Sequence, residues 1–282
     1  MELLTQYVSK PTIGTRIDWS DPITEGLLAC WSFSERGGGR ITDSATINHG
    51  TARVNLKFRM GGVDCSNSWI DVPRTNLSFK NTDKISLFCV VRNLTNTANQ
   101  GMGLIMRQEE AGNFQGWAWD IFTSGFLRFQ LINNSSSNLI DARSSLAVSF
   151  NRRQYSLATT YNGSSRAEGV KHFINGRKGT TNIVTNTLTG SPYFNISPRI
   201  GAYNGAAVTS FLKGVLLIMA VWKRELTEAE IVDLHNNPYT MFESYKISIP
   251  TFKAPTTAST VFRKTLSSIG SRVGSRQVHG WS

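Results

Sequence analysis

The 282-residue chain lacks any long apolar run. A helix that crosses a bilayer needs about 20 consecutive apolar residues, and no segment approaches that length. The first residues, MELLTQYVSKPTIGT, also lack the basic stretch and apolar core of a secretory signal peptide. We therefore expect a protein without a membrane-spanning helix, which is made in the cytoplasm of the cell that produces it and is not secreted.

Cysteine is scarce, and its spacing does not indicate a metal site. Cys30, Cys65 and Cys89 each lie in or beside an apolar, strand-like segment. Their number is odd, and no Cys-x-x-Cys or Cys/His spacing indicates a zinc site. We expect three buried free thiols.

Common catalytic motifs are absent as well. No G-x-S-x-G elbow occurs, and His49, His172, His235 and His279 have no supporting motif around them. Residues 37–39, Gly-Gly-Gly, are not followed by a helix that begins with Lys-Ser/Thr, so they predict a turn and not a phosphate-binding loop. A Ser/His/Asp arrangement assembled only in space stays open at this point.

Acidic residues are outnumbered by basic ones, which gives a net charge of +11. The segment 246–282 has no Asp or Glu, and it carries Lys246, Lys253, Arg263, Lys264, Arg272 and Arg276. This balance favours an acidic partner: nucleic acid, an anionic glycan or an acidic protein surface. The rest of the chain has no arginine-rich helix and no RNA-binding aromatic signature, so nucleic acid is the least favoured of the three.

Short strand-like segments recur about every ten residues through the middle of the chain. β-branched and aromatic residues fill them, while Gly, Asn and Ser fill the gaps. Residues 126–131, FLRFQL, alternate apolar and polar, which predicts one buried and one wet face. The pattern predicts an all-β, two-sheet antiparallel sandwich. The clearest predicted strands are 27–33, 69–72, 85–91, 117–122, 126–132, 155–161, 170–174, 199–202 and 215–222.

A single short helix is predicted at Thr227. Thr227 and Glu230 have the capping-box spacing, in which each side chain satisfies a backbone amide of the other residue. Leu226, Ile231 and Leu234 can share one face against the sandwich, and Pro238 ends the helix.

Composition divides the chain into three parts. Residues 1–25 are an extended N-terminal arm with little periodicity, and Trp19 is its predicted anchor. Residues 26–238 form the β domain. Residues 239–282 are an extended basic C-terminal arm, which has too few apolar residues to fold alone. We expect both arms to dock on neighbouring subunits.

Several motifs along the chain resemble those of laminin-G-like domains with the concanavalin-A-like jelly roll. The opening GLLACWSFSERGGGRITDSATINHGT is similar to the start of such domains, with Trp31, Asp43 and His49 in matching places. Four further motifs follow in the order that the family shows: residues 173–176 (FING), 199–201 (RIG), 211–214 (FLKG) and 224–231 (RELTEAEI). The resemblance covers about residues 26–238 and implies a jelly roll that binds ligands more often than it catalyses.

The resemblance also implies where catalysis would have to lie. Related glycoside hydrolases carry an E-x-D-x-x-E strand, because hydrolysis needs two carboxylates on one side of the sheet. No such string occurs here, and Glu109 and Glu110 are adjacent, so their side chains would point to opposite faces. We therefore expect no enzymatic activity.

Calcium and glycan sites are the binding sites that the resemblance implies. Many relatives hold one Ca²⁺ through Asp, Asn and backbone oxygens, and the candidates here are Asp43, Asp64, Asp71 and Asp120. The alternative is that these aspartates end strands and cap turns. For a glycan, Trp117 and Trp119 share one sheet face and form the predicted patch together with Asp120, Tyr203 and Asn204; the alternative for the two tryptophans is the core.

The N-terminal PTIGTRIDWSDP segment is similar to laminin-G-like proteins of tailed bacteriophages. This resemblance implies a virion structural protein, either a capsid decoration protein or a part of the tail or fibres. It would be a homo-oligomer bound to other virion proteins and would display its jelly roll toward host-surface glycans. The alternative is a free carbohydrate-binding lectin, with or without calcium. The predicted assembly contacts are Trp19, Phe252, Phe262, Arg263, Lys264, Arg272, Arg276 and Trp281.

Overall fold

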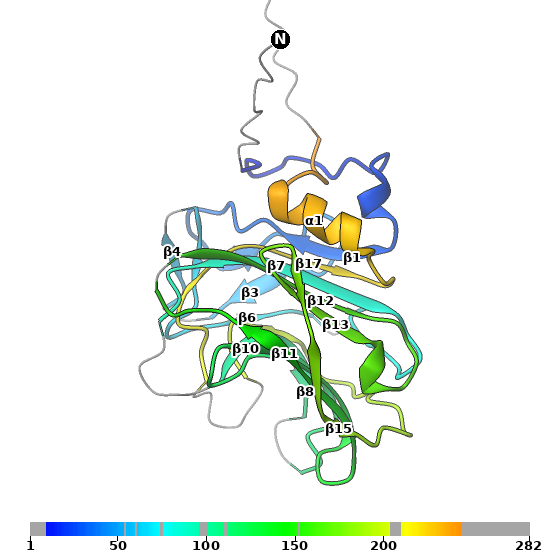
Figure 1. The fold of residues 1–282 in the computed structure, drawn as a ribbon. Coiled ribbons are helices and arrows are strands. Elements are labelled where there is room, and N and C mark those ends of the chain that lie inside the picture. Colours follow the sequence, from blue (N-terminus) through cyan, green and yellow to red (C-terminus); the bar gives the residue numbers. More distant parts are fainter. Residues whose placement is uncertain are drawn as a thin grey trace, which may run out of the picture. The chain divides into compact units, whose positions relative to one another are not determined.

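The fold is a sandwich of two antiparallel sheets, as the strand pattern predicts (Figure 1). A computed structural model describes residues 10–53, 55–59, 61–73, 76–95, 101–109, 112–151, 153–203 and 210–243. All nine of the clearest predicted strands are present, some shifted by one or two residues at an end. Shorter strands such as β2–β5 have too few residues for alternation to mark them.

One sheet has eight strands, in the spatial order β14-β13-β12-β7-β17-β5-β4, and β1 also pairs with β17. Its central strands β7 and β17 are buried on both faces, which explains why both are almost continuously apolar. The strands are β1 (Leu27–Trp31), β4 (Lys57–Arg59), β5 (Gly62–Asp64), β7 (Ile85–Arg92), β12 (Gln154–Tyr161), β13 (Val170–Ile174), β14 (Arg177–Gly179) and β17 (Val215–Trp222).

The other sheet has nine strands, in the order β15-β11-β10-β9-β8-β16-β6-β3-β2. Its strand β10 alternates between buried and half-exposed positions, so this sheet has one core face and one outer face. The strands are β2 (Arg40–Ile41), β3 (Gly50–Ala52), β6 (Ile70–Asp71), β8 (Met102–Gln108), β9 (Gly116–Ile121), β10 (Phe126–Asn134), β11 (Asn138–Ala147), β15 (Thr181–Asn186) and β16 (Arg199–Ile200).

A chain of hydrogen bonds crosses the core between the sheets. Trp119 Nε1 donates to Thr159 Oγ1 at 2.8 Å, Thr159 Oγ1 lies 2.8 Å from His172 Nδ1, and His172 Nε2 lies 3.1 Å from the Ala142 carbonyl. Burial lowers the pKa of His172 to about 4, so the imidazole is neutral near pH 7. The imidazole then donates from Nε2 and accepts at Nδ1 from the Thr159 hydroxyl, so every polar side-chain atom in this row of hydrogen bonds has a partner.

The outer face of the eight-stranded sheet is covered by a second apolar core. The helix α1 (Glu228–Asn236) lies over this face, together with η1 (Pro22–Thr24) and the residues that flank it (Figure 1). Buried residues in this second core include Ile17, Ile23, Phe88, Trp222, Ile231, Leu234 and Phe242. Residues on both sides of the predicted domain 26–238 therefore pack on it, and the compact unit that contains them extends to Glu243.

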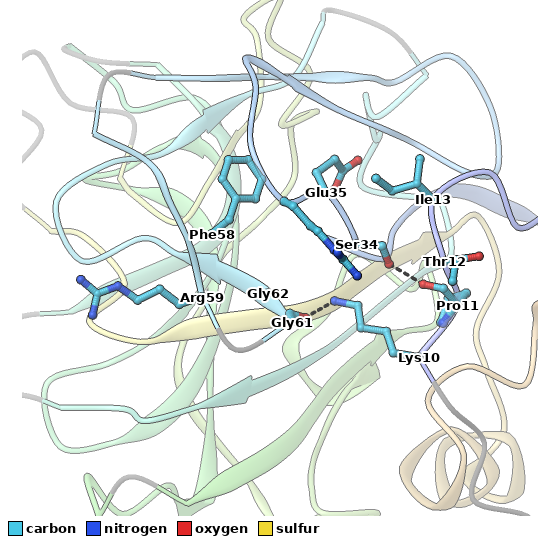
Figure 2. Close-up of a pocket in the computed structure, with 11 residues that line it drawn as sticks. Lys10, Pro11, Thr12, Ile13, Ser34, Glu35, Phe58, Arg59, Gly61 and Gly62 are labelled. Carbon is cyan, nitrogen blue, oxygen red and sulfur yellow. Dashed lines mark hydrogen bonds between the residues drawn. The ribbon is translucent and has the colours of Figure 1, made fainter.

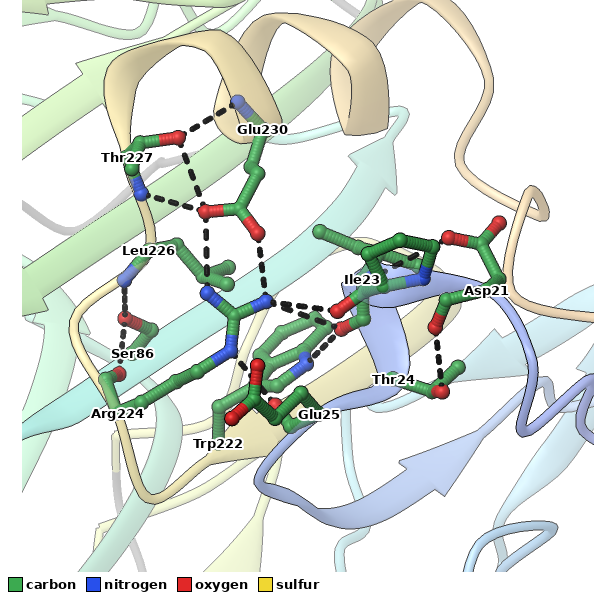
Figure 3. Close-up of polar contacts among 11 residues, drawn as sticks. Asp21, Ile23, Thr24, Glu25, Ser86, Trp222, Arg224, Leu226, Thr227 and Glu230 are labelled. Atoms are coloured by element: carbon green, nitrogen blue, oxygen red, sulfur yellow. Dashed lines mark hydrogen bonds and ion pairs between the residues drawn. The ribbon is translucent and has the colours of Figure 1, made fainter.

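Arg224 links α1 to the N-terminal segment around η1 (Figure 3). Its guanidinium pairs with both carboxylate oxygens of Glu230 at 3.0 and 2.6 Å, and it donates to the backbone carbonyl of Glu25 at 2.6 Å. Trp222 Nε1 donates to the carbonyl of Ile23 at 2.8 Å. Thr227 and Glu230 form the predicted capping box at the start of α1. One charged group thus joins the helix start to the N-terminal segment.

The three cysteines are free and buried, as predicted. No helix among the described residues is long and apolar enough to cross a membrane.

Candidate ligand-binding cleft on the nine-stranded sheet

The outer face of the nine-stranded sheet is lined by polar and charged side chains, and we call it the cleft face. On β9 the alternation sends Trp117 and Trp119 inward and Asp120 outward. The two tryptophans are 1% and 0% exposed, and their indole N–H groups donate to Leu77 O and Thr159 Oγ1. The prediction that they stack on a sugar is therefore wrong, and the core alternative holds for both. Spacing alone places them on one face but does not say which face that is.

Asp120 and Tyr203 come together with Arg128, which the sequence did not single out. Arg128 Nη2 lies 2.8 Å from Asp120 Oδ2, and the Tyr203 hydroxyl donates to the same oxygen at 2.6 Å. Arg128 also donates to the Tyr203 oxygen. Burial raises the pKa of Asp120, and Arg128 acts in the opposite direction. Burial lowers the pKa of Arg128, but Asp120 more than offsets this, so Arg128 stays charged.

A second ion pair lies beside the first on the cleft face, on strand β11 next to β10. Arg143 pairs with Asp141 at 2.9 Å, and Gln130 Nε2 donates to Asp141 at 3.1 Å. The guanidinium carbons of Arg128 and Arg143 lie 4.7 and 4.1 Å from the centroid of the Phe122 ring, so both cations contact this ring. These contacts hold the long side chains of the cleft face in fixed orientations.

A cleft of about 320 Å³ opens beside these groups. Its lining combines amides, a guanidinium, hydroxyls, an exposed aromatic ring and aliphatic groups. Phe114 is 41% exposed and has a positive φ of 51°, an unusual backbone state for a bulky residue. Such a lining can bind a small ligand that has both hydroxyl groups and an apolar face. The lining residues are Gln108, Phe114, Arg128, Gln130, Ile132, Ser135, Leu139 and Tyr203. Asn204 lies outside the described residues.

The aspartates predicted to bind calcium each have other partners. Asp43 accepts five hydrogen bonds, from the backbone amides of Cys30, Ala45, Thr46 and Asn48 and from the Thr46 hydroxyl. A carboxylate surrounded by donors has no lone pair directed at a cation, so Asp43 organises its turn instead, as the alternative proposed.

Asp64 and Asp71 pair with arginines, and Asp120 pairs with Arg128. Asp64 lies 3.4 Å from Arg59, while Asp71 pairs with both Arg53 and Arg199. Among the described residues no group of three or more His, Cys, Asp or Glu side chains is arranged to hold a metal ion. The residues present therefore do not fit the calcium site that the resemblance implies.

A larger cavity of about 650 Å³ lies between residues 10–13, the segment 34–36 and strands β4 and β5 (Figure 2). The Lys10 ammonium donates to the carbonyls of Phe33 at 2.8 Å, Leu217 at 3.1 Å and Gly61. Burial lowers the pKa of Lys10 to about 8, and the nearby Glu35 acts in the opposite direction. Because three carbonyls occupy its three donors, Lys10 fastens the N-terminal segment and is not available as a nucleophile.

The predicted assembly contacts fall mostly outside the described residues. This is true of Phe252, Phe262, Arg263, Lys264, Arg272, Arg276 and Trp281. Trp19 is described and is 58% exposed. Ile17 and Ile23, not Trp19, hold the N-terminal segment on the sandwich, so Trp19 as a contact to a neighbour stays a prediction.

The two antiparallel sheets form a jelly-roll β sandwich, and one of its outer faces carries a polar cleft. The family model described as "Concanavalin A-like lectin/glucanases superfamily" (Laminin_G_3) matches residues 64–232. The chain belongs to this family. No curated protein sequence matches the chain.

Several solved structures share the fold. A Trypanosoma rangeli sialidase in complex with sialic acid is 13% identical, with a TM-score of 0.56, over 78% of this chain and 34% of that one. The binding domain of Paraclostridial Mosquitocidal Protein 1 is 16% identical, with a TM-score of 0.57, over 77% of this chain and 53% of that one. A structure titled for botulinum neurotoxin type C and its interaction with two ganglioside molecules is 15% identical, with a TM-score of 0.52, over 76% and 51%. The match spans about a third to a half of these chains, and identities this low show the fold alone.

Proposed function

We propose that this protein is a non-catalytic, lectin-like module that binds a glycan in the cleft of the nine-stranded sheet. The observation that carries the proposal is the lining of that cleft. Amide, guanidinium and hydroxyl groups surround a half-exposed phenyl ring and two aliphatic side chains. A sugar presents hydroxyls around its rim and C–H groups on its faces, and this lining complements both.

Preorganisation supports the proposal. Tyr203 and Arg128 are held by the buried Asp120, and Gln130 and Arg143 are held by Asp141. Side chains that are already ordered lose less conformational entropy when a ligand binds. Three similar folds are titled for a sialic acid complex, a ganglioside interaction and a toxin binding domain, which is compatible with a glycan ligand here.

The carboxylates of the cleft face favour binding over hydrolysis. Glycoside hydrolysis by the usual route uses one carboxyl group as acid and a second as base or nucleophile. Asp120 and Asp141 are 0% and 5% exposed, and each is paired with an arginine. Both carboxylates therefore act as supports for neighbouring side chains.

The test is binding to a panel of glycans, followed by calorimetry on the best ligand. Phe114→Ala removes the exposed ring and should weaken binding about tenfold, which is about 1.4 kcal/mol. Trp19→Ala is the matched control, because it removes an exposed aromatic ring from the layer on the other sheet. Binding that is insensitive to Phe114→Ala and Gln130→Ala, or a panel with no bound glycan, would contradict the proposal.

The hypothesis of a phage virion protein is a second proposal, at the level of assembly. Its support is the basic segment 246–282, which has no acidic residue, and the exposed Trp19. In this proposal the chain is a capsid decoration or tail-associated protein that docks through residues 244–282 and displays the cleft. The compact unit ends at Glu243, so a chain truncated there should fold. Normal incorporation of that truncated chain into particles would refute a docking role for the segment.

A further inference from the structure

Two polar side chains of β10 line the cleft, and a buried aspartate holds each of them. Arg128 and Gln130 both face outward from this strand, since the residues between and beside them are buried. Their Cα atoms lie about 7 Å apart, because they are two residues apart along a strand. Asp120 fixes Arg128 and Asp141 fixes Gln130, so the remaining polar atoms of both side chains also have fixed places.

The orientation of the Gln130 amide follows from its partner. Gln130 Nε2 lies 3.1 Å from Asp141 Oδ2. An ionised carboxylate only accepts hydrogen bonds, so the amide nitrogen and not the amide oxygen must face Asp141. No described residue donates to Gln130 Oε1. The cleft lining therefore contains a free acceptor whose position is set by Asp141.

Arg128 supplies a donor beside this acceptor. Its Nε and Nη2 nitrogens are occupied by Asp120, and Nη2 also donates to the Tyr203 hydroxyl. The third nitrogen, Nη1, carries two N–H groups, and none of the described residues accepts a hydrogen bond from it. Asp120 already balances the charge of this guanidinium, so a neutral carbonyl oxygen is a sufficient acceptor for Nη1.

An apolar floor lies next to these polar groups. Ile132 follows Gln130 on the same face of β10, and Leu139 is its direct neighbour on β11. The exposed ring of Phe114 forms another part of the cleft wall. The region around Gln130 thus places a donor, an acceptor and aliphatic groups within reach of one small chemical group.

An acetamido group has the matching set of features. It carries a carbonyl oxygen that accepts, an N–H that donates and a methyl group. The C=O and N–H of a trans amide point in opposite directions, so one amide can bridge a donor and an acceptor on side chains about 7 Å apart. A plain hexose has hydroxyl groups but no methyl group, and a 6-deoxy sugar has a methyl group but no amide.

We propose that the cleft selects an N-acetylated amino sugar. The acetamido carbonyl accepts from Arg128 Nη1, and the acetamido N–H donates to Gln130 Oε1. The methyl group contacts Ile132 and Leu139, and the sugar ring lies against the Phe114 ring. This inference rests on the proposed glycan-binding function and names the class of sugar.

A peptide offers the same carbonyl and N–H groups, so it is the alternative ligand. The rest of the lining favours a sugar, because Ser135 and Tyr203 bring hydroxyl oxygens and Phe114 brings an aromatic face for the C–H groups of a pyranose ring. Trialanine with an acetyl group at one end and a methylamide at the other, measured beside the sugars, tests the alternative.

The experiment measures calorimetric affinities of the full chain for three methyl glycosides in the gluco and the galacto series: the 2-acetamido sugar, the 2-O-acetyl sugar and the parent hexose. In at least one series the 2-acetamido sugar should bind at least about tenfold more tightly than the hexose, because hydrogen bonds to both ends of the amide and a methyl contact are added. The 2-O-acetyl sugar keeps the carbonyl and the methyl group but has no N–H, so its affinity should lie between the two.

One variant tests the acceptor. Gln130→Met keeps the length of the side chain and removes the amide oxygen. It should lower affinity for the 2-acetamido sugar about fivefold, to about that of the 2-O-acetyl sugar, and should lower affinity for the 2-O-acetyl sugar much less. Gln154→Met is the matched control, because it removes an exposed amide at the start of β12 on the other sheet. Thermal unfolding of each variant shows whether the fold is kept.

The outcomes separate this inference from the proposed function. If the hexose binds as tightly as the 2-acetamido sugar in both series, the inference is overturned, while glycan binding in the cleft stands as long as Phe114→Ala weakens it. Equal losses with Gln130→Met and Gln154→Met, or equal losses for the 2-acetamido and 2-O-acetyl sugars, also overturn it. Tighter binding of the blocked trialanine than of any sugar would overturn it in favour of a peptide ligand. If no sugar of either series binds, the inference is overturned, and the wider glycan panel decides the proposed function separately.

Discussion

The two sheets of the sandwich differ in what covers their outer faces. The eight-stranded sheet carries apolar side chains there, such as Phe88 and Trp222, and these are buried under α1 and the segment around η1. The nine-stranded sheet carries Arg128, Arg143 and Asp120, which are held in ion pairs around an open cleft. The two outer faces of one jelly roll thus differ in kind: apolar packing covers one of them, and ion-paired polar side chains line the cleft on the other.

The largest expected effect is on the covered face. Trp222→Ala removes a fully buried indole and its hydrogen bond to Ile23, so we expect a loss of about 4 kcal/mol in the free energy of unfolding. Urea denaturation measures this loss, and Trp19→Ala, an exposed tryptophan of the same layer, should cost less than about 0.5 kcal/mol. Equal effects of the two variants would contradict a second core on this sheet.

The open face also contributes to stability through its buried ion pair. Asp120→Asn leaves the Arg128 charge without its counter-ion in a site where Arg128 is only 12% exposed, so we expect a loss of about 3 kcal/mol. Arg153→Gln, at an exposed position with no ion pair among the described residues, is the control. A stable Asp120→Asn variant that also binds glycan normally would show that the cleft does not depend on this support.

A third effect is expected in the core between the two sheets, at His172. Folding lowers the pKa of His172 from its ordinary value of 6.5 to about 4, so the unfolded chain binds more protons between these values. The neutral His172 therefore contributes to the free energy of unfolding. This contribution is fully present above about pH 6.5 and falls by about 3 kcal/mol in all as the pH drops toward 4. Unfolding free energies measured from pH 7 to pH 4 check this. His172→Gln should flatten the curve in that range, and an unchanged slope would contradict it.

The smallest effect is expected at the start of α1. Thr227→Ala removes a hydroxyl that accepts from the Glu230 amide, so we expect a loss of about 1 kcal/mol. Thr227→Ser keeps the cap and serves as the control, with urea denaturation again as the measurement. A loss as large as that of Trp222→Ala would mean that the cap orders the whole covering layer.

Much of the fold was predictable because it depends on patterns of neighbouring residues in the sequence. Alternation along residues 126–131 and the Thr227–Glu230 spacing each report a neighbour relation within one element, and both predictions are confirmed. The side of the sheet on which Trp117 and Trp119 lie depends on which face meets the other sheet, and no local pattern records this. Arg128 was missed because its partner Tyr203 is brought near by pairing between distant strands. Ile17 and Ile23 were not recognised as core residues because two apolar residues are too few to give a periodic signal.

Residues 16–18 lie beside residues 241–243 at the end of the compact unit. Ile17 pairs antiparallel with Phe242, flanked by hydrogen bonds from Asp18 N to Met241 O at 2.9 Å and from Glu243 N to Arg16 O at 3.0 Å. A pull applied between Arg16 and Glu243 would load these bonds one after the other, as in opening a zipper, and not all at once. Under such a pull the pairing between Ile17 and Phe242 would therefore open first. The load would not yet have reached either sheet, so the cleft would keep its shape.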